Sequence, residues 1–266
     1  MNYDKEYDVN GIVQYDAATE LLTLLSNSAK RVLDIGCGSG RVTKRLQEYT
    51  AASSLIAIDQ SQQMIDEASK SYQDDSIKFI HCSIEEFANS NEHAIAEKFD
   101  LITSNSSFQW FRDHSIALRN IHAALSPNGV FVVQTPYKAN WCPTIVAMME
   151  NFFSDCYPEL KPFHRFPCMH LESTDAYSQL FQQNGFIVNE LYSKEFHYDL
   201  SSSDFVKVFK SGAYKVYSYQ EWFAVDLPAD YSERLLDYVE DYTKGHERIS
   251  ISMPRVFARV SKSASK

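Results

Sequence analysis

Three glycines at alternate positions constrain this 266-residue chain more than any other feature. The whole chain holds eight glycines, and three of them, Gly36, Gly38 and Gly40, fall in one stretch that follows Asp34. An apolar run typical of a buried strand precedes the stretch, and a helical pattern follows it. Glycine lets the backbone turn tightly and lets a ligand approach the main chain. The pattern therefore predicts a ligand site, and the alternative is a structural turn capped by the aspartate.

The charges beside this turn distinguish two kinds of ligand. A dinucleotide would place a pyrophosphate at the glycines, but Asp34 stands two residues before the first glycine and would repel it. S-adenosylmethionine (SAM) has no phosphate and carries an ammonium and a sulfonium, so a carboxylate suits it. Asp59, at the end of the next expected strand, has the spacing of an acceptor for ribose hydroxyls. The turn therefore predicts SAM, with a nicotinamide-dependent oxidoreductase as the distant alternative.

Short apolar runs alternate with longer amphipathic runs along the chain. Strands are expected at residues 31–35, 55–58, 77–81, 101–103 and 130–135, and helices at 41–49, 61–72 and 115–125. A turn signal at 126–129 precedes the fifth of these strands. Strands that alternate with helices form a parallel sheet flanked by helices. Later patterns predict helices at 175–184, 203–210 and 231–244, a strand at 186–192 and a last strand, as an added hairpin strand, at 255–260.

Proline density changes after the fifth expected strand. Five of the eight prolines fall between Pro136 and Pro167, and prolines at that density interrupt regular structure. We therefore expect a lid or substrate-binding insertion over about residues 137–174.

Composition restricts the partners of the chain. It carries 35 acidic against 25 basic side chains, for a formal net charge of −10, and it has no dense basic stripe, so we expect no nucleic-acid partner. No apolar run approaches the ~20 residues that cross a bilayer, and the first ten residues do not resemble an export signal. We therefore expect a cytoplasmic protein with no membrane partner. The eight histidines have no metal-ligand spacing, so no metal site is expected.

The motifs resemble those of the class I SAM-dependent methyltransferases from about residue 3 to the end of the chain. Residues 32–42 resemble the first motif of that family, 56–64 the acidic second motif, 100–105 the fourth-strand motif and 125–133 the turn into the fifth strand. The resemblance implies an α/β, Rossmann-like fold with a mostly parallel seven-stranded sheet, helices on both faces and a lid after the fifth strand. It also implies a single domain over residues 1–266, in which residues 1–30 form a helical cover.

The same resemblance assigns cofactor-binding residues. The positions carried over from the family are Asp34, Gly36, Cys37, Gly38, Asp59, Gln60, Met64, Ser83, Ile84 and Asn105. It implies that Asp34 holds the ammonium or a water, that Asp59 binds the ribose, and that Met64 packs near the adenine. Asn105 would line the methionine side. Ser83 departs from the family, which commonly has an aspartate there facing the adenine amino group; a serine hydroxyl can form hydrogen bonds but lacks the charge.

A narrower resemblance concerns the methyl acceptor. The stretch from Ser104 to Trp110 is similar to the S-N-x-x-x-Q-W stretch of carboxyl O-methyltransferases that act on trans-aconitate or on malonyl-acyl-carrier protein. Residues 253–257 look like the former group, and residues 164–166 resemble the latter. The resemblance implies O-methylation of a small acid or acyl thioester, free or bound to a carrier protein. A carboxylate is ionised at pH 7, so the reaction needs alignment and desolvation. No residue is therefore assigned as a catalytic base.

Six residues are candidates for the acceptor pocket. They are Arg165, Trp110, Tyr7, Tyr15, Tyr137 and Trp141. Arg165, in the proline-rich segment, would clamp a carboxylate with its bidentate fork, although each of the six could be an ordinary surface or core side chain. Two alternatives stay open for the whole chain: a SAM-dependent methyltransferase with a nitrogen, phenol-oxygen or carbon acceptor, and a catalytically silent SAM-fold subunit that binds a protein partner.

Overall fold

A computed structural model of the chain describes residues 12–25, 28–72, 74–87 and 98–262. The chain folds into two compact units. The first, here called the sheet unit, contains residues 14–137, 170–194 and those from 255 onward. The second, here called the helical unit, contains residues 138–169 and 195–254. The single-domain organisation over residues 1–266 stays a prediction.

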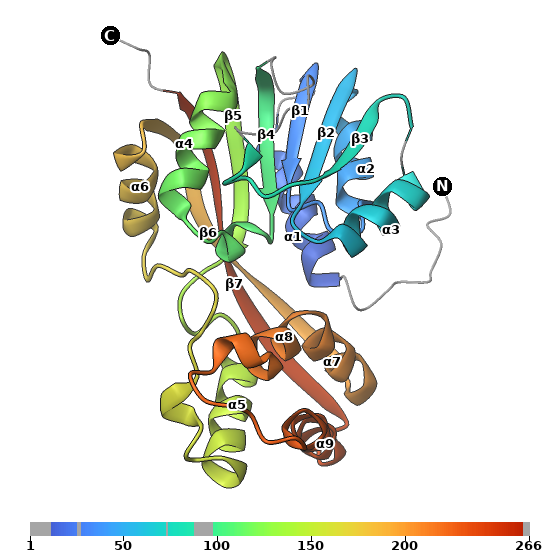
Figure 1. Cartoon of the computed structure of the whole chain (residues 1–266), viewed down its shortest axis with the longest axis vertical. Coiled ribbons are helices and arrows are strands. Elements are labelled where there is room, and N and C mark those ends of the chain that lie inside the picture. Colours follow the sequence, from blue (N-terminus) through green and yellow to red (C-terminus); the bar gives the residue numbers. More distant parts are fainter. Residues whose placement is uncertain (1–11, 26–27, 73, 88–97, 263–266) are drawn as a thin grey trace. The chain divides into compact units, whose positions relative to one another are not determined.

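A seven-stranded sheet, counted over the described residues, organises the sheet unit (Figure 1). In chain order its strands are β1 (Arg31–Ile35), β2 (Ser54–Asp59), β3 (Ile77–His81), β4 (Phe99–Asn105), β5 (Leu125–Pro136), β6 (Phe186–Ser201) and β7 (Arg248–Lys262). The strand order is β3-β2-β1-β4-β5-β7-β6. Strands β1 to β5 pair in parallel, and β7 pairs with β5 in the antiparallel sense. The predicted Rossmann-like, mostly parallel sheet with an added antiparallel strand is confirmed.

The strands at the centre of the sheet are apolar because helices cover both faces. Figure 1 shows α4 and α6 in front of the sheet and α1 and α2 behind it. Val32, Leu33 and Ile56 are all at most 2% exposed. Strands buried on both faces are continuous apolar runs in the sequence, and each buried aliphatic side chain contributes about 1.5–3 kcal/mol relative to exposure. Burial on two faces is therefore what made these strands recognisable.

The helices of the sheet unit begin where the sequence supplies a cap. They are α1 (Ile12–Thr23, from Gln14 onward), α2 (Arg41–Thr50), α3 (Gln62–Tyr72), α4 (His114–Ala124) and α6 (Thr174–Gln183), with a short 3-10 turn η4 (Phe108–Trp110). The Asp113 side chain accepts from the backbone N–H of Ile116 at 2.9 Å and caps α4. Ser173 caps α6 in the same way, accepting from Ala176 at 3.1 Å. Each such cap stabilises its helix by about 1 kcal/mol.

The helical unit has an aromatic core. Its helices are α5 (Pro143–Cys156), η5 (Lys161–Phe163), α7 (Ser202–Val208), the π-helical turn η6 (Phe209–Ala213), α8 (Tyr214–Ser218), η7 (Gln220–Trp222) and α9 (Tyr231–Lys244). The Phe152 ring on α5 lies 5.6 Å from that of Tyr231 and 5.3 Å from that of Tyr238, both on α9. Both contacts are edge-on, the geometry that aromatic rings prefer.

Two predictions of local structure were wrong in part. The proline-rich stretch was expected to interrupt regular structure, but it contains the 14-residue helix α5. Pro143 stands in the first turn of that helix, where a missing N–H costs no hydrogen bond. Residues 126–129 were expected to precede a strand and instead lie inside β5, which pairs with β4 at Leu125 and again at Val130. They bulge out of the ladder between those two positions. That residues 137–174 form a lid stays a prediction.

Three kinds of feature are absent from the described residues. No helix there is long and apolar enough to cross a membrane. No group of three or more histidine, cysteine, aspartate or glutamate side chains there could hold a metal ion. The five cysteines all lie in the described ranges, and no disulfide joins any two of them.

Candidate functional site

The three glycines between β1 and α2 all have positive φ, but for different reasons. Gly36, Gly38 and Gly40 have φ of 71°, 54° and 83°, a region that side chains with a Cβ rarely adopt. A Cβ on Gly36 would stand 2.2 Å from the Cβ of Ser107, so this glycine is needed for packing within the protein. A Cβ on Gly38 would meet nothing within 4 Å. Gly38 is therefore the position at which the turn leaves its backbone open to a ligand.

Both carboxylate oxygens of Asp59, at the end of β2, are held by backbone N–H groups, and one of these belongs to the glycine turn. Its Oδ2 accepts from the backbone N–H of Gly38 at 2.9 Å, and its Oδ1 accepts from that of Ser61 at 2.9 Å. Each carboxylate oxygen can accept more than one hydrogen bond. The carboxylate is thus held in place beside the open position and keeps acceptor capacity for the hydroxyls of a ribose.

Asp34 has a more internal position than the sequence suggested. It is 3% exposed, and its oxygens accept from the hydroxyls of Thr103 on β4 at 2.9 Å and Thr43 on α2 at 2.7 Å. Burial raises the pKa of this carboxyl, while the two hydroxyl contacts lower it. Asp34 therefore links three elements around the turn, and its role toward an ammonium stays a prediction.

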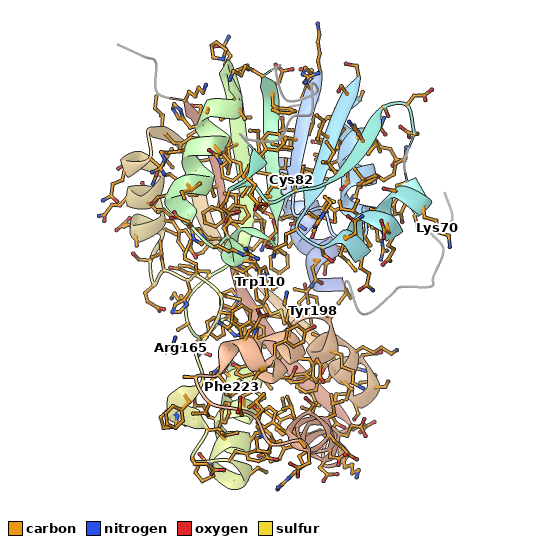
Figure 2. The ribbon with its side chains drawn as sticks, in the orientation of Figure 1. Lys70, Cys82, Trp110, Arg165, Tyr198 and Phe223 are labelled. Carbon is orange, nitrogen blue, oxygen red and sulfur yellow. The ribbon has the colours of Figure 1, made fainter. Side chains whose placement is uncertain are left out.

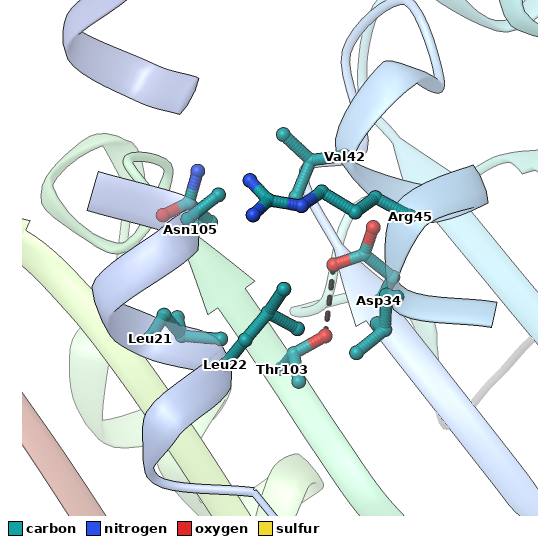
Figure 3. Close-up of a pocket in the computed structure, with 9 residues that line it drawn as sticks. Leu21, Leu22, Asp34, Val42, Arg45, Thr103 and Asn105 are labelled. Carbon is teal, nitrogen blue, oxygen red and sulfur yellow. Dashed lines mark hydrogen bonds between the residues drawn. The ribbon is translucent and has the colours of Figure 1, made fainter. Parts of the chain in front are cut away.

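A small cavity adjoins Asp34 (Figure 3). Its lining includes Leu21 and Leu22 from α1, Arg45 from α2 and Thr103 from β4. The cavity measures about 10 Å³, the room of roughly one water molecule. Asn105 of β4 also lines this cavity, which as it stands is too small for a nucleoside.

Asn105, at the end of β4, presents an acceptor with no donor among the described residues. Its Nδ2 donates to the backbone oxygen of Gln14 on α1 at 3.2 Å. Its Oδ1 is buried and accepts no hydrogen bond from that part of the chain, and the same holds for the Oε1 of Gln14. An unsatisfied buried acceptor costs about 1–3 kcal/mol, and the ammonium of SAM would supply the missing donor. The residues present therefore fit that cofactor.

Gln14 was not recognised as a site residue from the sequence. It is one of several polar residues in α1, and nothing near it in the chain distinguishes it from the others. Its importance comes from the contact with Asn105, which is 91 residues away. A one-dimensional pattern carries no sign of such a contact.

The loop after β3 lies beside Asp59. The backbone N–H of Cys82 donates to the backbone oxygen of Asp59 at 3.0 Å. Ser83 follows, and its hydroxyl donates to Oε2 of Glu86 at 3.0 Å. Ile84 is buried, with 2% exposure. The structure therefore brings Ser83 and Ile84 to the same edge of the sheet as the glycine turn and Asp59.

The other predicted cofactor residues lie at the same edge. Cys37 is buried within the turn, and burial raises the pKa of its thiol, so it is not a nucleophile. Gln60 is exposed, and its backbone oxygen is 3.0 Å from Nε2 of His81. Met64 is half-buried in the first turn of α3. Cofactor binding by these three residues stays a prediction.

Three of the predicted acceptor residues lie in the sheet unit. The Tyr15 ring is covered by the guanidinium of Arg45, 4.4 Å from the ring centre. Tyr137 is buried, and its hydroxyl donates to the backbone oxygen of Glu172 at 3.5 Å. Trp110 is half-buried in η4, the turn that follows β4 (Figure 2). Tyr15 and Tyr137 thus have partners of their own, and a role for any of the three in acceptor binding stays a prediction.

Arg165 lies in the helical unit and pairs with Trp222 through the backbone. Its backbone N–H donates to the oxygen of Trp222 at 2.7 Å, and the neighbouring residues His164 and Phe223 form an antiparallel bridge. Residues opposite each other in such a pair have Cβ atoms about 5 Å apart and share a face. The Arg165 side chain is exposed (Figure 2), and Nε1 of Trp222 is buried with no acceptor among the described residues. A guanidinium suits a carboxylate, and binding of the acceptor by Arg165 stays a prediction.

The structure does not test the acceptor role of the last two predicted residues. Trp141 is half-buried in the helical unit, just before α5. Tyr7 lies outside the described residues. Both stay predictions.

Comparison with known proteins finds related sequences. A family model described as a methyltransferase domain matches residues 26–185. The chain is 33% identical over 138 residues to a malonyl-[acyl-carrier protein] O-methyltransferase of Priestia megaterium, covering 50% of this chain and 48% of the relative. It is 34% identical over 144 residues to a trans-aconitate 2-methyltransferase of Escherichia coli, covering 53% of each. The chain thus spans about half the length of the curated relatives it matches.

The fold is shared more widely than the sequence. The crystal structure of the YcgJ protein from Bacillus subtilis superposes with a TM-score of 0.58 at 18% identity. The match covers 94% of this chain and 100% of that one. At that identity the likeness concerns the fold alone.

Proposed function

Because this chain belongs to the class I SAM-dependent methyltransferases, we propose that it methylates a carboxylate oxygen of a small acid or acyl thioester. The observation that carries the proposal is the likeness to two groups of relatives whose names both describe acids. A malonyl thioester has one free carboxylate, and trans-aconitate has three. A carboxylate is therefore the acceptor that these relatives have in common.

Different residues at this edge of the sheet bind different parts of the cofactor. SAM, when bound, supplies a methyl group on a positively charged sulfur. Asp59 accepts from the ribose hydroxyls, since both of its oxygens are already oriented by backbone N–H groups. Asn105 accepts from the ammonium with its buried Oδ1. Gly38 gives the ligand access to the backbone.

The acceptor needs binding and alignment more than acid–base chemistry. A carboxylate with a pKa of about 4 is already a nucleophile at pH 7, so the protein must exclude water and hold the reacting oxygen in line. Arg165 supplies an exposed guanidinium, which can bind a carboxylate through two parallel hydrogen bonds. We assign Arg165 to a carboxylate of the acceptor.

The test is the alkali lability of the product. The full chain is incubated with SAM labelled in its methyl group and with trans-aconitate, malonyl-coenzyme A or malonyl-acyl-carrier protein. We expect label in a product that mild alkali hydrolyses to methanol, as a methyl ester does. The same acids with their carboxylates converted to amides are the control and should accept no label.

Two outcomes would contradict the proposal. Label that survives alkali would indicate a nitrogen, phenol-oxygen or carbon acceptor. Binding of SAM with no transfer to any acid would favour a subunit that uses the SAM fold for binding alone.

A further inference from the structure

We propose that Glu86 determines which purine the cofactor site accepts. By holding the proton of the Ser83 hydroxyl, Glu86 turns that hydroxyl into an acceptor, which selects a 6-aminopurine over a 6-oxopurine. The proposal rests on the proposed binding of the ribose at Asp59. It does not depend on the identity of the methyl acceptor.

The position of the base follows from the order of the strands. The sheet runs β3-β2-β1-β4, and Asp59 ends β2 while the glycine turn and Asn105 follow β1 and β4. A ligand with its amino-acid end at β1 and β4 and its ribose at Asp59 extends its base toward the end of β3. The loop that follows β3 begins there with Cys82 (Figure 2), whose backbone N–H donates to the backbone oxygen of Asp59 at 3.0 Å. Ser83 is the next residue.

The hydrogen bonds of Ser83 determine what its hydroxyl can offer to a ligand. A hydroxyl has one proton and two lone pairs. The proton goes to Oε2 of Glu86 at 3.0 Å, and one lone pair accepts from the backbone N–H of Glu86 at 3.3 Å. One lone pair is left. Toward a ligand, Ser83 is therefore an acceptor and not a donor.

This character matches adenine and not hypoxanthine. Adenine has an amino donor at C6, which the remaining lone pair of Ser83 can accept. Hypoxanthine has a carbonyl oxygen there, so two acceptors would face each other. A hydroxyl free of Glu86 could rotate and donate to that carbonyl, and the discrimination would be lost. Glu86 is thus a positioning residue that acts through Ser83.

The same two residues also form a turn, and the two roles can be separated. The backbone N–H of Glu86 donates to the backbone oxygen of Ser83 at 3.2 Å. Glu86→Ala keeps this N–H and removes the carboxylate alone. The turn should therefore survive a change that frees the hydroxyl. Glu67→Ala, which removes an exposed acid from α3, is the matched control.

The experiment compares two ligands that differ at C6 of the purine and in the proton that hypoxanthine carries on N1. Contacts to N1 that do not involve Glu86 affect the ratio equally in wild type and variant, so the change in the ratio reports the C6 contact. S-adenosylhomocysteine and S-inosylhomocysteine carry the same charges, so a change in electrostatic potential cancels in the ratio of their Kd values. Isothermal titration of the full chain should give a ratio of roughly tenfold in favour of the adenine ligand, the value of one net hydrogen bond. In Glu86→Ala the ratio should fall to about threefold or less, mainly because the inosine ligand binds more tightly. Glu67→Ala should keep the original ratio.

Several results would overturn the proposal. If the ratio of Kd values is unchanged in Glu86→Ala, or if the Kd values of both ligands rise by the same factor, the carboxylate only supports the loop. Ser83→Ala provides the second test, because it should lower the preference at least as far as Glu86→Ala does, even if Glu86→Ala folds poorly. Failure of wild type to prefer the adenine ligand would refute the role of Ser83 itself. None of these titrations contains a methyl acceptor, so their failure is distinct from a failure of the carboxylate proposal.

Discussion

Alanine substitutions at Gly36 and Gly38 separate packing from ligand access in the glycine turn. Both residues have positive φ, 71° and 54°, where a Cβ costs about 1–2 kcal/mol. At Gly36 the new Cβ would also stand 2.2 Å from the Cβ of Ser107 and 2.5 Å from its Oγ. Overpacking of this kind costs about 1–3 kcal/mol. We expect a loss of about 2–5 kcal/mol for Gly36→Ala and about 1–2 kcal/mol for Gly38→Ala.

Thermal unfolding and ligand titration measure the two effects separately. A domain of this size loses about 2–4 °C of Tm per kcal/mol, so Gly36→Ala should lower Tm by about 4–20 °C and Gly38→Ala by about 2–8 °C. For binding of S-adenosylhomocysteine we expect the opposite order: Gly38→Ala should lower the affinity more than Gly36→Ala does. Gly38→Ala should raise the Kd of S-adenosylhomocysteine by at least about tenfold, because its Cβ would occupy space that no protein atom fills. The same variant should keep most of the stability of the wild type.

A double variant provides the control. Ser107→Gly removes the atoms that the new Cβ would meet, so it should restore part of the Tm lost in Gly36→Ala. The reasoning is refuted if Gly36→Ala and Gly38→Ala lose the same stability. It is also refuted if Gly38→Ala binds the ligand as well as the wild type does.

Three further predictions concern single side chains. Asp59→Asn should raise the Kd of S-adenosylhomocysteine by about 10–100-fold in a titration, because hydrogen bonds to a charged acceptor are worth about 1.5–3 kcal/mol. An unchanged Kd would exclude the binding of the ribose by Asp59. Arg165→Ala should raise the KM of the acid by about tenfold or more and leave that of SAM unchanged, and equal effects on both would exclude the clamp. Burial raises the pKa of Asp34 above its usual value of about 4, so the folded chain binds a proton there that the unfolded chain releases. This contribution favours folding below that value and is lost as pH rises through the folded pKa. In urea unfolding, wild type should therefore lose stability relative to Asp34→Asn as pH rises above about 4, and a pH-independent difference would contradict this.

The sheet could be predicted because its signals are local. Strand β1 was predicted at its observed bounds, Arg31–Ile35, since strands buried on both faces are continuous apolar runs. Helix α9 was also predicted at its observed bounds, Tyr231–Lys244, because Gly245 follows its last periodic residue. In both cases the information lies within a few residues of the element.

The site was predicted less completely because its geometry depends on distant pairs. The sequence placed Asp34 at the turn as a charge that faces the ligand, but the hydroxyls of Thr43 and Thr103 occupy both of its oxygens. The need for glycine at position 36 comes from Ser107, 71 residues later. Such contacts are created when strands become neighbours in the sheet, and no local spacing records them.

The antiparallel pairing of β5 with β7 has a consequence for how the chain is made. The β7 residues that cover the edge of β5, from Arg255 to Ser261, are synthesised roughly 120 residues after Pro136 ends that strand. At about 5–20 residues per second, the edge stays open on the ribosome for about 6–24 seconds. An open edge strand is a template for pairing with another nascent chain. Within the chain, the edge of β5 is covered only once the last strand has emerged.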